Sequence, residues 1–255
     1  MAIVETQNLT RIYKMGAAEV HALQGVDLVV EQGEFVSVMG RSGSGKSTLL
    51  HLVGCLDRPT EGVIRLDGLE VTGLPKRRLP RIRREKVGFV FQQFNLLSSA
   101  TALENVMLPL RYSDVGRREG RQRAQALLEE VGLGERVTHR PTEMSGGEQQ
   151  RVAVARALIN NPAIVLADEP TGELDTHTAG EIISVLHELN TRDGQTFIIV
   201  THDPLVAEST DRTIYLQDGI IVDEVRRRRV NGYLSAEQAE RQENARPDTF
   251  RENSE

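Results

Sequence analysis

Long apolar runs, cysteine and an excess of positive charge are all scarce or missing in this sequence. No stretch approaches the roughly 18 consecutive apolar residues of a membrane-spanning helix, so we expect a chain that crosses no membrane. We also expect no secretory signal, because no basic start followed by an apolar run opens the sequence. If the protein serves a membrane process, another chain must supply the membrane part.

A single cysteine, Cys55, excludes an internal disulfide framework and fits a cytosolic setting. Its apolar surroundings favour buried packing over reactivity. The net charge of -6 is opposite in sign to the footprint of nucleic acid-binding proteins, so no nucleic acid partner is expected. The local basic run at residues 76–86 leaves two interpretations open, a solvated helix face or contact with anionic lipid or a partner.

The segment from Gly40 to Thr48 matches the phosphate-loop pattern G-x-x-x-x-G-K-[ST] at each fixed position. An apolar strand at residues 34–39 precedes it and a helix at residues 46–55 follows, which separates it from a chance Gly/Ser turn. Backbone N–H groups, the positive helix end and the Lys46 ammonium all favour phosphate oxygens, and Ser47 offers a hydroxyl to Mg²⁺. A nucleoside triphosphate site is therefore predicted. Its expected contacts are Gly40, Ser42, Gly43, Ser44, Gly45, Lys46, Ser47 and Thr48.

Apolar strands alternate with helices along much of the chain, which predicts an α/β fold with a mostly parallel sheet. Residues 163–167 and 196–200 resemble strands buried on both faces, and the helix between them has apolar residues at helical spacing. Residues 1–35 are typical of short strands and turns, with Tyr13 in a polar segment between them. The pattern is helical from about 95 to 160, and residues 212–222 predict a hairpin. Apolar residues become scarce from Arg226, where residues 235–244 are compatible with a polar helix.

Two adjacent acids, Asp168 and Glu169, directly follow the apolar strand at residues 164–167. In a phosphate-loop fold, an Asp at this strand end reaches Mg²⁺ directly or through water. Glu169 is then placed to orient or deprotonate a water that attacks the γ-phosphate. Loops often contain such pairs, so this prediction depends on the phosphate loop.

A second candidate anion site begins the long helix after Met144, at Ser145-Gly146-Gly147. Free N–H groups, a positive helix end and a hydroxyl suit phosphate, although Ser145 is equally suited to be a simple N-cap. Two such helix starts, about 100 residues apart, exceed what one nucleotide needs. They fit two chains packed head to tail, each completing the other's site.

Together these motifs resemble, in content and order, those of ATP-binding cassette (ABC) ATPases over roughly residues 1–225. The resemblance implies a P-loop NTPase core of the RecA-like type, an N-terminal antiparallel β subdomain and an inserted helical subdomain. It places the β subdomain and catalytic core at 1–92 and 160–225, the helical subdomain at 93–159, and a charged extension at 226–255. ATP is the implied nucleotide and Mg²⁺ the implied metal.

The resemblance also implies residue roles. Tyr13 would stack on adenine, Gln92 would sense the γ-phosphate and touch a membrane partner, and His202 would be the switch histidine. On the residues alone, Tyr13 and His202 would more often be structural. The implied catalytic residues are Glu169, His202, Lys46 and Gln92, and the metal ligands are Ser47, Gln92 and Asp168. The further ATP-binding residues, expected at the subunit seam, are Ser145, Gly146, Gly147 and Asp175.

Two departures from the family pattern are present. The signature has Met144 for the common Leu and Glu148 for the common Gln, and this Glu recurs in one large branch of the family. Glu173 stands where that branch usually has Asn, which adds negative charge close to Glu169 and to the expected seam.

Residues 39–50, 56–60, 88–97 and 144–158 are most similar to one subfamily. It includes lipoprotein-release, macrolide-export and antimicrobial-peptide-resistance ATPases, and the ATPase of a cell-division complex. This similarity implies a homodimer on the cytoplasmic face of the cell membrane that drives a permease by mechanotransmission or export. The alternative is a soluble ABC ATPase acting on DNA, ribosomes or Fe–S assembly, which predicts insertions or tandem cassettes not found in these 255 residues. A kinase or switch GTPase leaves residues 145–147 unexplained, and the guanine-reading N-K-x-D is absent.

Overall fold

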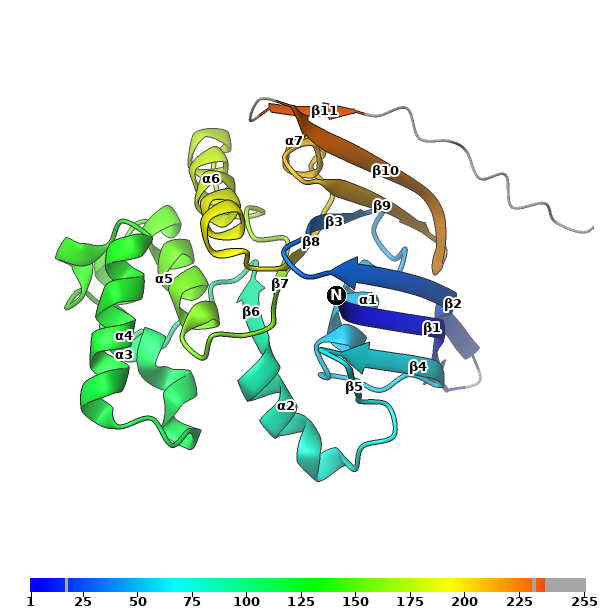
Figure 1. The fold of residues 1–255 in the computed structure, drawn as a ribbon, viewed down its shortest axis with the longest axis horizontal. Coiled ribbons are helices and arrows are strands. Elements are labelled where there is room, and N and C mark those ends of the chain that lie inside the picture. Colours follow the sequence, from blue (N-terminus) through cyan, green and yellow to red (C-terminus); the bar gives the residue numbers. More distant parts are fainter. Residues whose placement is uncertain (17, 231–232, 237–255) are drawn as a thin grey trace, which may run out of the picture.

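A computed structural model describes residues 1–16, 18–230 and 233–236, which form two sheets and two groups of helices (Figure 1). The smaller sheet is antiparallel and four-stranded, in the order β2-β1-β4-β5. Its strands are β1 (Ala2–Met15), β2 (Ala18–Glu31), β4 (Glu61–Leu66) and β5 (Leu69–Glu70). This is the antiparallel β subdomain that the family resemblance implied.

The larger sheet is seven-stranded, in the order β11-β10-β9-β3-β8-β7-β6. Strands β3, β6, β7, β8 and β9 pair in parallel, and β10 and β11 continue the sheet antiparallel. The bounds are β3 (Phe35–Met39), β6 (Val87–Phe91), β7 (Ile164–Asp168), β8 (Phe197–Thr201), β9 (Arg212–Gln217), β10 (Ile220–Val230) and β11 (Tyr233–Ala236). The predicted α/β fold with a mostly parallel sheet is confirmed. Because parallel strands end at one edge, the residues after β3, β6, β7 and β8 gather there.

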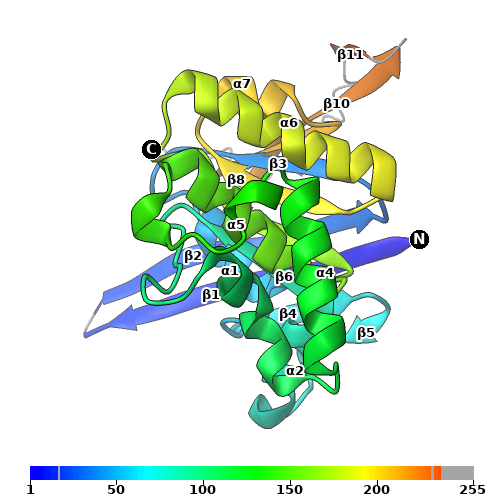
Figure 2. The same ribbon diagram turned by 90° about the vertical axis from the view of Figure 1, so that its left-hand side faces the viewer.

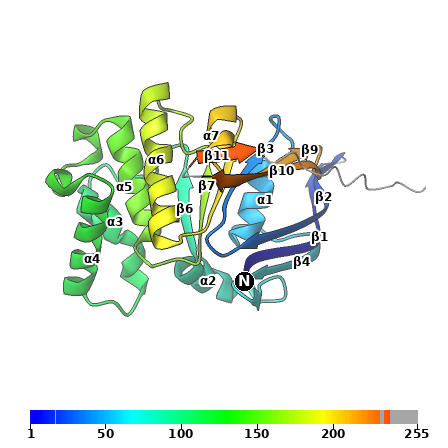
Figure 3. The same cartoon turned by 45° about the horizontal axis from the view of Figure 1, so that its top comes forward.

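The helices divide into two groups: α1 and α2 contribute to the apolar cluster that includes the smaller sheet, whereas α3, α4, α5, α6 and α7 contribute to the cluster on the other face of the larger sheet. Figures 1 and 3 show α3, α4 and α5 on the side away from the smaller sheet, and Figure 2 shows α4 and α5 in front of β6. The α-helices are α1 (Lys46–Val53), α2 (Leu79–Lys86), α3 (Ala102–Met107), α4 (Arg117–Glu130), α5 (Gly146–Leu158), α6 (Thr176–Asp193) and α7 (Pro204–Glu208). Short 3-10 helices span Lys76–Arg78, Leu108–Tyr112, Gly134–Arg136 and Pro141–Glu143. None of the helices in these described ranges is long and apolar enough to cross a bilayer.

Strand β7 shows how the sequence pattern produces two cores. Ile164 and Leu166 belong to the apolar cluster that contains α1, whereas Val165 and Ala167 belong to the cluster that contains α5 and α6. All four side chains are 0% exposed, so the strand is buried on both faces, as its unbroken apolar run predicted. Helices α1 and α5 therefore pack against opposite faces of β7.

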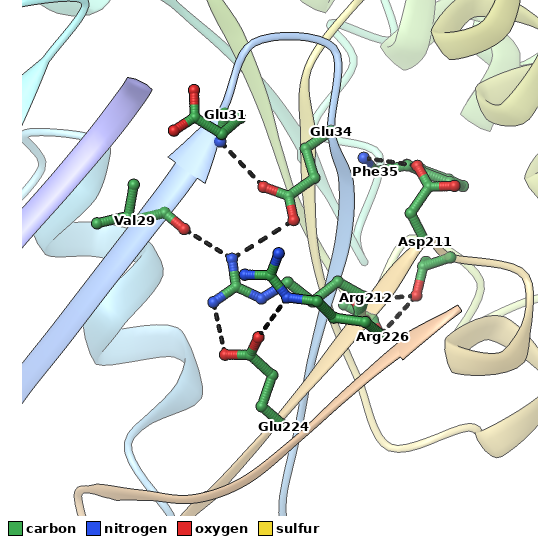
Figure 4. Close-up of polar contacts among 10 residues, drawn as sticks. Val29, Glu31, Glu34, Phe35, Asp211, Arg212, Glu224 and Arg226 are labelled. Atoms are coloured by element: carbon green, nitrogen blue, oxygen red, sulfur yellow. Dashed lines mark hydrogen bonds and ion pairs between the residues drawn. The ribbon is translucent and has the colours of Figure 1, made fainter. Parts of the chain in front are cut away.

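A buried arginine connects the smaller sheet to the larger one (Figure 4). The Arg212 side chain on β9 is 8% exposed and pairs with Glu34, before β3, and with Glu224 on β10, at 3.4 and 2.6 Å. Its guanidinium also donates to the Val29 carbonyl on β2 at 2.7 Å. Burial acts to raise the pKa of Glu224, but hydrogen bonds from Arg212 and Arg226 outweigh it and hold that pKa below its usual value.

Two expectations about local structure are wrong. Tyr13 does not lie in a polar segment between short strands, because β1 extends as one long strand past it to Met15. The strand β10 continues through residues 226–230, and Ser235 lies in β11, so no helix begins there. The other positions considered for that helix, from residue 237 on, lie outside the described residues.

Candidate nucleotide-binding site

The phosphate loop joins the end of β3 to the start of α1, and two of its glycines have no room for a side chain. A Cβ at Gly40 would collide with the Leu216 carbonyl, and one at Gly45 would collide with the Ala22 carbonyl. Gly45 also has φ +103, a backbone conformation that side chains disfavour. The loop is therefore pressed between β9 and β2, which fixes the direction of its N–H groups.

Lys46 and Ser44 line the inside of this loop. Lys46 is 7% exposed, and its ammonium donates to the carbonyls of Gly40 and Arg41 at 2.8 and 3.0 Å. The Ser44 hydroxyl is buried and has no hydrogen-bond partner among the described residues. An unpaired buried hydroxyl beside an ammonium at a helix start fits an anionic ligand. The flanking positions Ser42, Gly43 and Ser47 are exposed and Thr48 is half-buried.

Ser47 and Asp168 come together from α1 and the end of β7. The Ser47 hydroxyl donates to Asp168 Oδ1 at 3.3 Å. Burial raises the pKa of Asp168, while the hydrogen bond from Ser47 and the charge of His51 oppose this effect. Two protein oxygens at this spacing next to the loop are suitable as neighbouring ligands of one Mg²⁺ ion. Gln92, the third predicted ligand, is exposed after β6, and its side chain lies against Gly172.

Glu169 and His202 follow the neighbouring strands β7 and β8, and their side chains meet. His202 Nδ1 lies 2.5 Å from Glu169 Oε2, with the histidine 70% and the glutamate 21% exposed. Glu169 has φ +47, and its N–H donates to the Val200 carbonyl at 2.9 Å. This turn aims the carboxylate along the sheet edge. A carboxylate held by an imidazole has the arrangement of an oriented general base.

Ser145, Gly146 and Gly147 begin α5, on the face of β7 opposite to α1. Ser145 caps the helix: its hydroxyl accepts from the Glu148 N–H at 3.2 Å, and Glu148 accepts from the Ser145 N–H at 2.8 Å. The hydrogen bond from the Ser145 backbone lowers the pKa of Glu148. The simple N-cap interpretation is therefore satisfied, and an anion reaching this helix start would meet an existing capping box.

Asp175, the other predicted seam residue, is the N-cap of α6. Its carboxylate accepts from the backbone of His177 and Thr178 at 3.1 Å each and from the Thr178 hydroxyl at 2.6 Å. The hydrogen bonds from Thr178 lower the pKa of Asp175. Gly147 lies against the Thr178 side chain, so the starts of α5 and α6 share one surface.

Sequence reasoning missed Gln150, a fully buried glutamine on α5. Its amide donates to the Pro170 carbonyl at 2.6 Å and to the Phe91 carbonyl at 3.4 Å. It thereby joins the signature helix to the segments that contain Glu169 and Gln92. A polar residue on the apolar face of the predicted helix was the available signal.

Tyr13 is held by two side chains rather than free in a loop. Its hydroxyl donates to Asp57 Oδ2 at 2.9 Å, and the Arg11 guanidinium lies 4.4 Å from the ring centre. The tyrosine is half-buried, so part of the ring remains accessible.

A groove lies away from the phosphate loop, between α2, β6 and the 3-10 helix at Leu108–Tyr112. Its volume is about 830 Å³. The lining combines apolar side chains with arginines and contains no acidic residue; it includes Leu56, Phe89, Leu108 and Tyr112 together with Arg77, Arg81, Arg84 and Arg156. We call it the α2 groove.

Comparison with known proteins gives concordant results. Residues 23–172 match the family model described as ABC transporter. The chain is 50% identical to the uncharacterized ABC transporter ATP-binding protein YvrO of Bacillus subtilis, over 85% of this chain and 95% of that protein. It is 49% identical to the macrolide export ATP-binding/permease protein MacB of Syntrophobacter fumaroxidans, but spans only 32% of that protein's length.

A solved structure is also similar. It is the dimeric, post-hydrolysis state of the ATP-binding cassette MJ0796 bound to ADP and Pi, with a TM-score of 0.80 and 49% identity over 88% of this chain and 98% of that one. The MJ0796 protein of Methanocaldococcus jannaschii is described as an uncharacterized ABC transporter ATP-binding protein.

Proposed function

This chain belongs to the ABC transporter family and is an ATP-hydrolysing subunit, and from that premise we propose that two copies close head to tail around two ATP molecules. The observation that supports this is the placement of α1 and α5 on opposite faces of β7. One nucleotide on the phosphate loop is therefore separated by the sheet from Ser145 of the same chain. The start of α5 is available to the nucleotide of a second chain.

In this proposal Lys46 exchanges its loop carbonyls for phosphate oxygens, and the Ser44 hydroxyl gains the partner that it lacks. Ser47, Asp168 and Gln92 would hold Mg²⁺, which would neutralise phosphate charge when bound. Glu169 accepts a proton from the attacking water while His202 keeps its carboxylate oriented. The water oxygen bonds to the γ-phosphorus, the bond to the β-phosphate oxygen breaks, and ADP and phosphate leave.

Mixing two defective variants tests the composite site. Lys46→Ala disables the phosphate loop, and Ser145→Arg blocks the start of α5. Each variant alone should neither dimerise with ATP nor hydrolyse it. A mixed dimer retains one intact site, formed by the loop of the Ser145→Arg chain and α5 of the Lys46→Ala chain. Restored ATP-dependent dimers and hydrolysis in the mixture are expected, and an inactive mixture would contradict a site completed by a second chain.

The proposed membrane partner is a permease that docks in the α2 groove, with the chain on the cytoplasmic face of the membrane. MacB carries a permease together with its ATP-binding part, as its name states. The groove supports this because its floor is apolar and Phe91 of β6, directly before Gln92, is among its lining residues. Export or mechanotransmission then follows from ATP-driven closure of the dimer.

A further inference from the structure

We propose that Asp57 and Arg11 are positioning residues that hold Tyr13 as a one-sided platform for the adenine base, at a fixed spacing from the phosphate loop. This inference rests on the proposed role of Tyr13 in binding ATP. It adds two charged residues that sequence reasoning did not single out.

The three side chains converge on one carboxylate. Asp57 accepts from the Tyr13 hydroxyl at 2.9 Å through Oδ2 and pairs with the Arg11 guanidinium at 2.8 Å through the same oxygen. Its Oδ1 accepts from Arg11 at 3.1 Å and from the backbone N–H of Arg58 at 2.7 Å. The Arg11 and Asp57 side chains are 22% and 32% exposed, so this is a partly enclosed cluster rather than a loose surface pair.

Arg11 gives the tyrosine ring two unequal faces. Its guanidinium lies 4.4 Å from the ring centre, which is a cation–π contact. Such a contact occupies one face of the ring; Tyr13 is half-buried, and in this proposal a second flat group stacks on the opposite face. A purine base is the flat group that ATP supplies, and stacking on an aromatic ring is a large, geometry-dependent interaction.

Asp57 connects this platform to the phosphate loop through α1. The helix begins at Lys46 and ends at Val53, and the N–H groups of Leu56 and Asp57 both donate to the His51 carbonyl at its last turn. The carboxylate that holds Tyr13 is thus fixed to the end of the helix whose start holds the phosphates.

Strand β2 provides a second connection between the same two places. Tyr13 pairs with Val20 in the β1–β2 ladder, and two residues further along β2 the Ala22 carbonyl lies against Gly45 of the loop. Two residues of strand correspond to about 7 Å. Helix α1 and strand β2 therefore both connect Tyr13 to the phosphate loop. We infer that Asp57 and Arg11 set the position of the base relative to the phosphates.

Calorimetric titration of the full chain with ATP and with inorganic tripolyphosphate separates base contacts from phosphate contacts. We expect Asp57→Asn and Tyr13→Phe each to weaken ATP binding about three- to tenfold, the equivalent of one ordinary net hydrogen bond, because the lost bond acts on the base only through the position of the ring. Tripolyphosphate binding should change less than about twofold. The double variant should be no weaker than the single ones, because both changes remove the same hydrogen bond. Arg11→Gln should weaken ATP binding to a similar degree, and in steady-state hydrolysis these variants should raise KM without lowering kcat.

Asp67→Asn is the matched control. Asp67 forms a comparable half-exposed pair with Lys86 at 2.6 Å, and its φ of +49 suits Asn. This variant should bind both ligands as the unmodified chain does. Tyr13→Ala removes the ring altogether, so its ATP binding gives the value expected when the base has no platform.

The outcomes are distinguishable. If Tyr13→Ala binds ATP normally, the proposed role of Tyr13 fails and this inference fails with it. If Tyr13→Ala weakens ATP binding but Asp57→Asn and Arg11→Gln do not, Tyr13 still binds the base and the positioning proposal alone is wrong. An equal loss of ATP and tripolyphosphate binding in Asp57→Asn would also overturn it, because the damage would then lie in the phosphate loop.

Discussion

At the scale of single residues, Glu169 depends on a turn that few side chains adopt. Its φ of +47 and its N–H bond to Val200 direct the carboxylate toward His202. Glu169→Gln keeps the shape of the side chain and removes its basicity, so hydrolysis should fall roughly a thousandfold while ATP still binds. ATP-bound dimers should accumulate, as measured by phosphate release and by size-exclusion chromatography.

Glu129→Gln is the matched control, because it is the same change at an exposed position on α4. Its turnover should stay within about threefold of the unmodified chain. Normal hydrolysis by Glu169→Gln would exclude Glu169 as the base.

Cys55 supports a prediction about pH. Burial raises the pKa of this thiol from 9.0 to about 11, with a smaller opposing effect from Arg83. Between these values the unfolded chain loses the thiol proton and the folded chain keeps it, so the stability present below pH 9.0 is lost as pH approaches 11. The difference in unfolding free energy between the unmodified chain and Cys55→Ala should shrink by about 2 kcal/mol between about pH 8 and about pH 10.5. Urea unfolding at both pH values measures it, and a constant difference would mean that the thiol ionises freely in the folded protein.

At the scale of elements, the Arg212 cluster of Figure 4 joins β2, β9 and β10. Arg212→Met would leave Glu34 and Glu224 without their buried partner, which should cost about 3 kcal/mol of unfolding free energy. Arg226→Met is the control, because Arg226 is 67% exposed and pairs with the same Glu224, so it should cost less than about 1 kcal/mol. Urea unfolding of both variants measures the two losses of unfolding free energy. Similar losses would contradict the prediction that the buried pairing of Arg212 stabilises the fold more than the exposed pairing of Arg226.

The parallel strands of the larger sheet were predictable, whereas the long β1–β2 hairpin, the second half of β10 and β11 were not. Unbroken apolar runs reveal strands buried on both faces, such as β7. In the hairpin, register shifts occur between Thr6 and Leu9 and again around Arg11, and Asn8 has φ +48. Each bulge resets the in–out alternation, so no continuous period of two extends as far as Tyr13.

Some residues of the candidate site could likewise be predicted from the sequence and others could not. The phosphate loop, the acids after β7 and the start of α5 were predictable because their chemistry requires certain residue types at fixed spacing. Asp57 and Gln150 were not, because their partners lie 44 and 20 residues away in sequence and no local pattern joins them. Only the folded chain shows that the Asp57 carboxylate bonds to Tyr13 and that the Gln150 amide bonds to Phe91, at the end of β6, and to Pro170, just after β7.

At the scale of the whole molecule, the α2 groove predicts how a partner is held. Its arginines are complementary to an acidic, partly apolar segment. Arg77→Glu should lower the recovery of an integral membrane protein with the tagged chain, at least about fivefold, when detergent-solubilised native membranes are purified. Arg78→Glu is the control, because Arg78 belongs to the same short helix but does not line the groove.

Two results of this purification would contradict the proposal. Equal recovery with both variants would exclude the groove as the docking site. Recovery of ribosomes or DNA without any integral membrane protein would instead support the soluble ABC ATPase.

Gln150 anchors α5 closer to the start of the helix than to its end. Its buried amide bonds to the carbonyls of Phe91 and Pro170 at a point five residues from Ser145 and eight from Leu158, or about 7.5 and about 12 Å along the axis. A tilt of α5 by about 10° about Gln150 would move the Ser145 end by about 1.3 Å. It would move the other end, near Arg156 and Ala157 of the α2 groove, by about 2 Å. A push at the groove that tilted α5 in this way would therefore move Ser145 by a smaller distance and in the opposite direction.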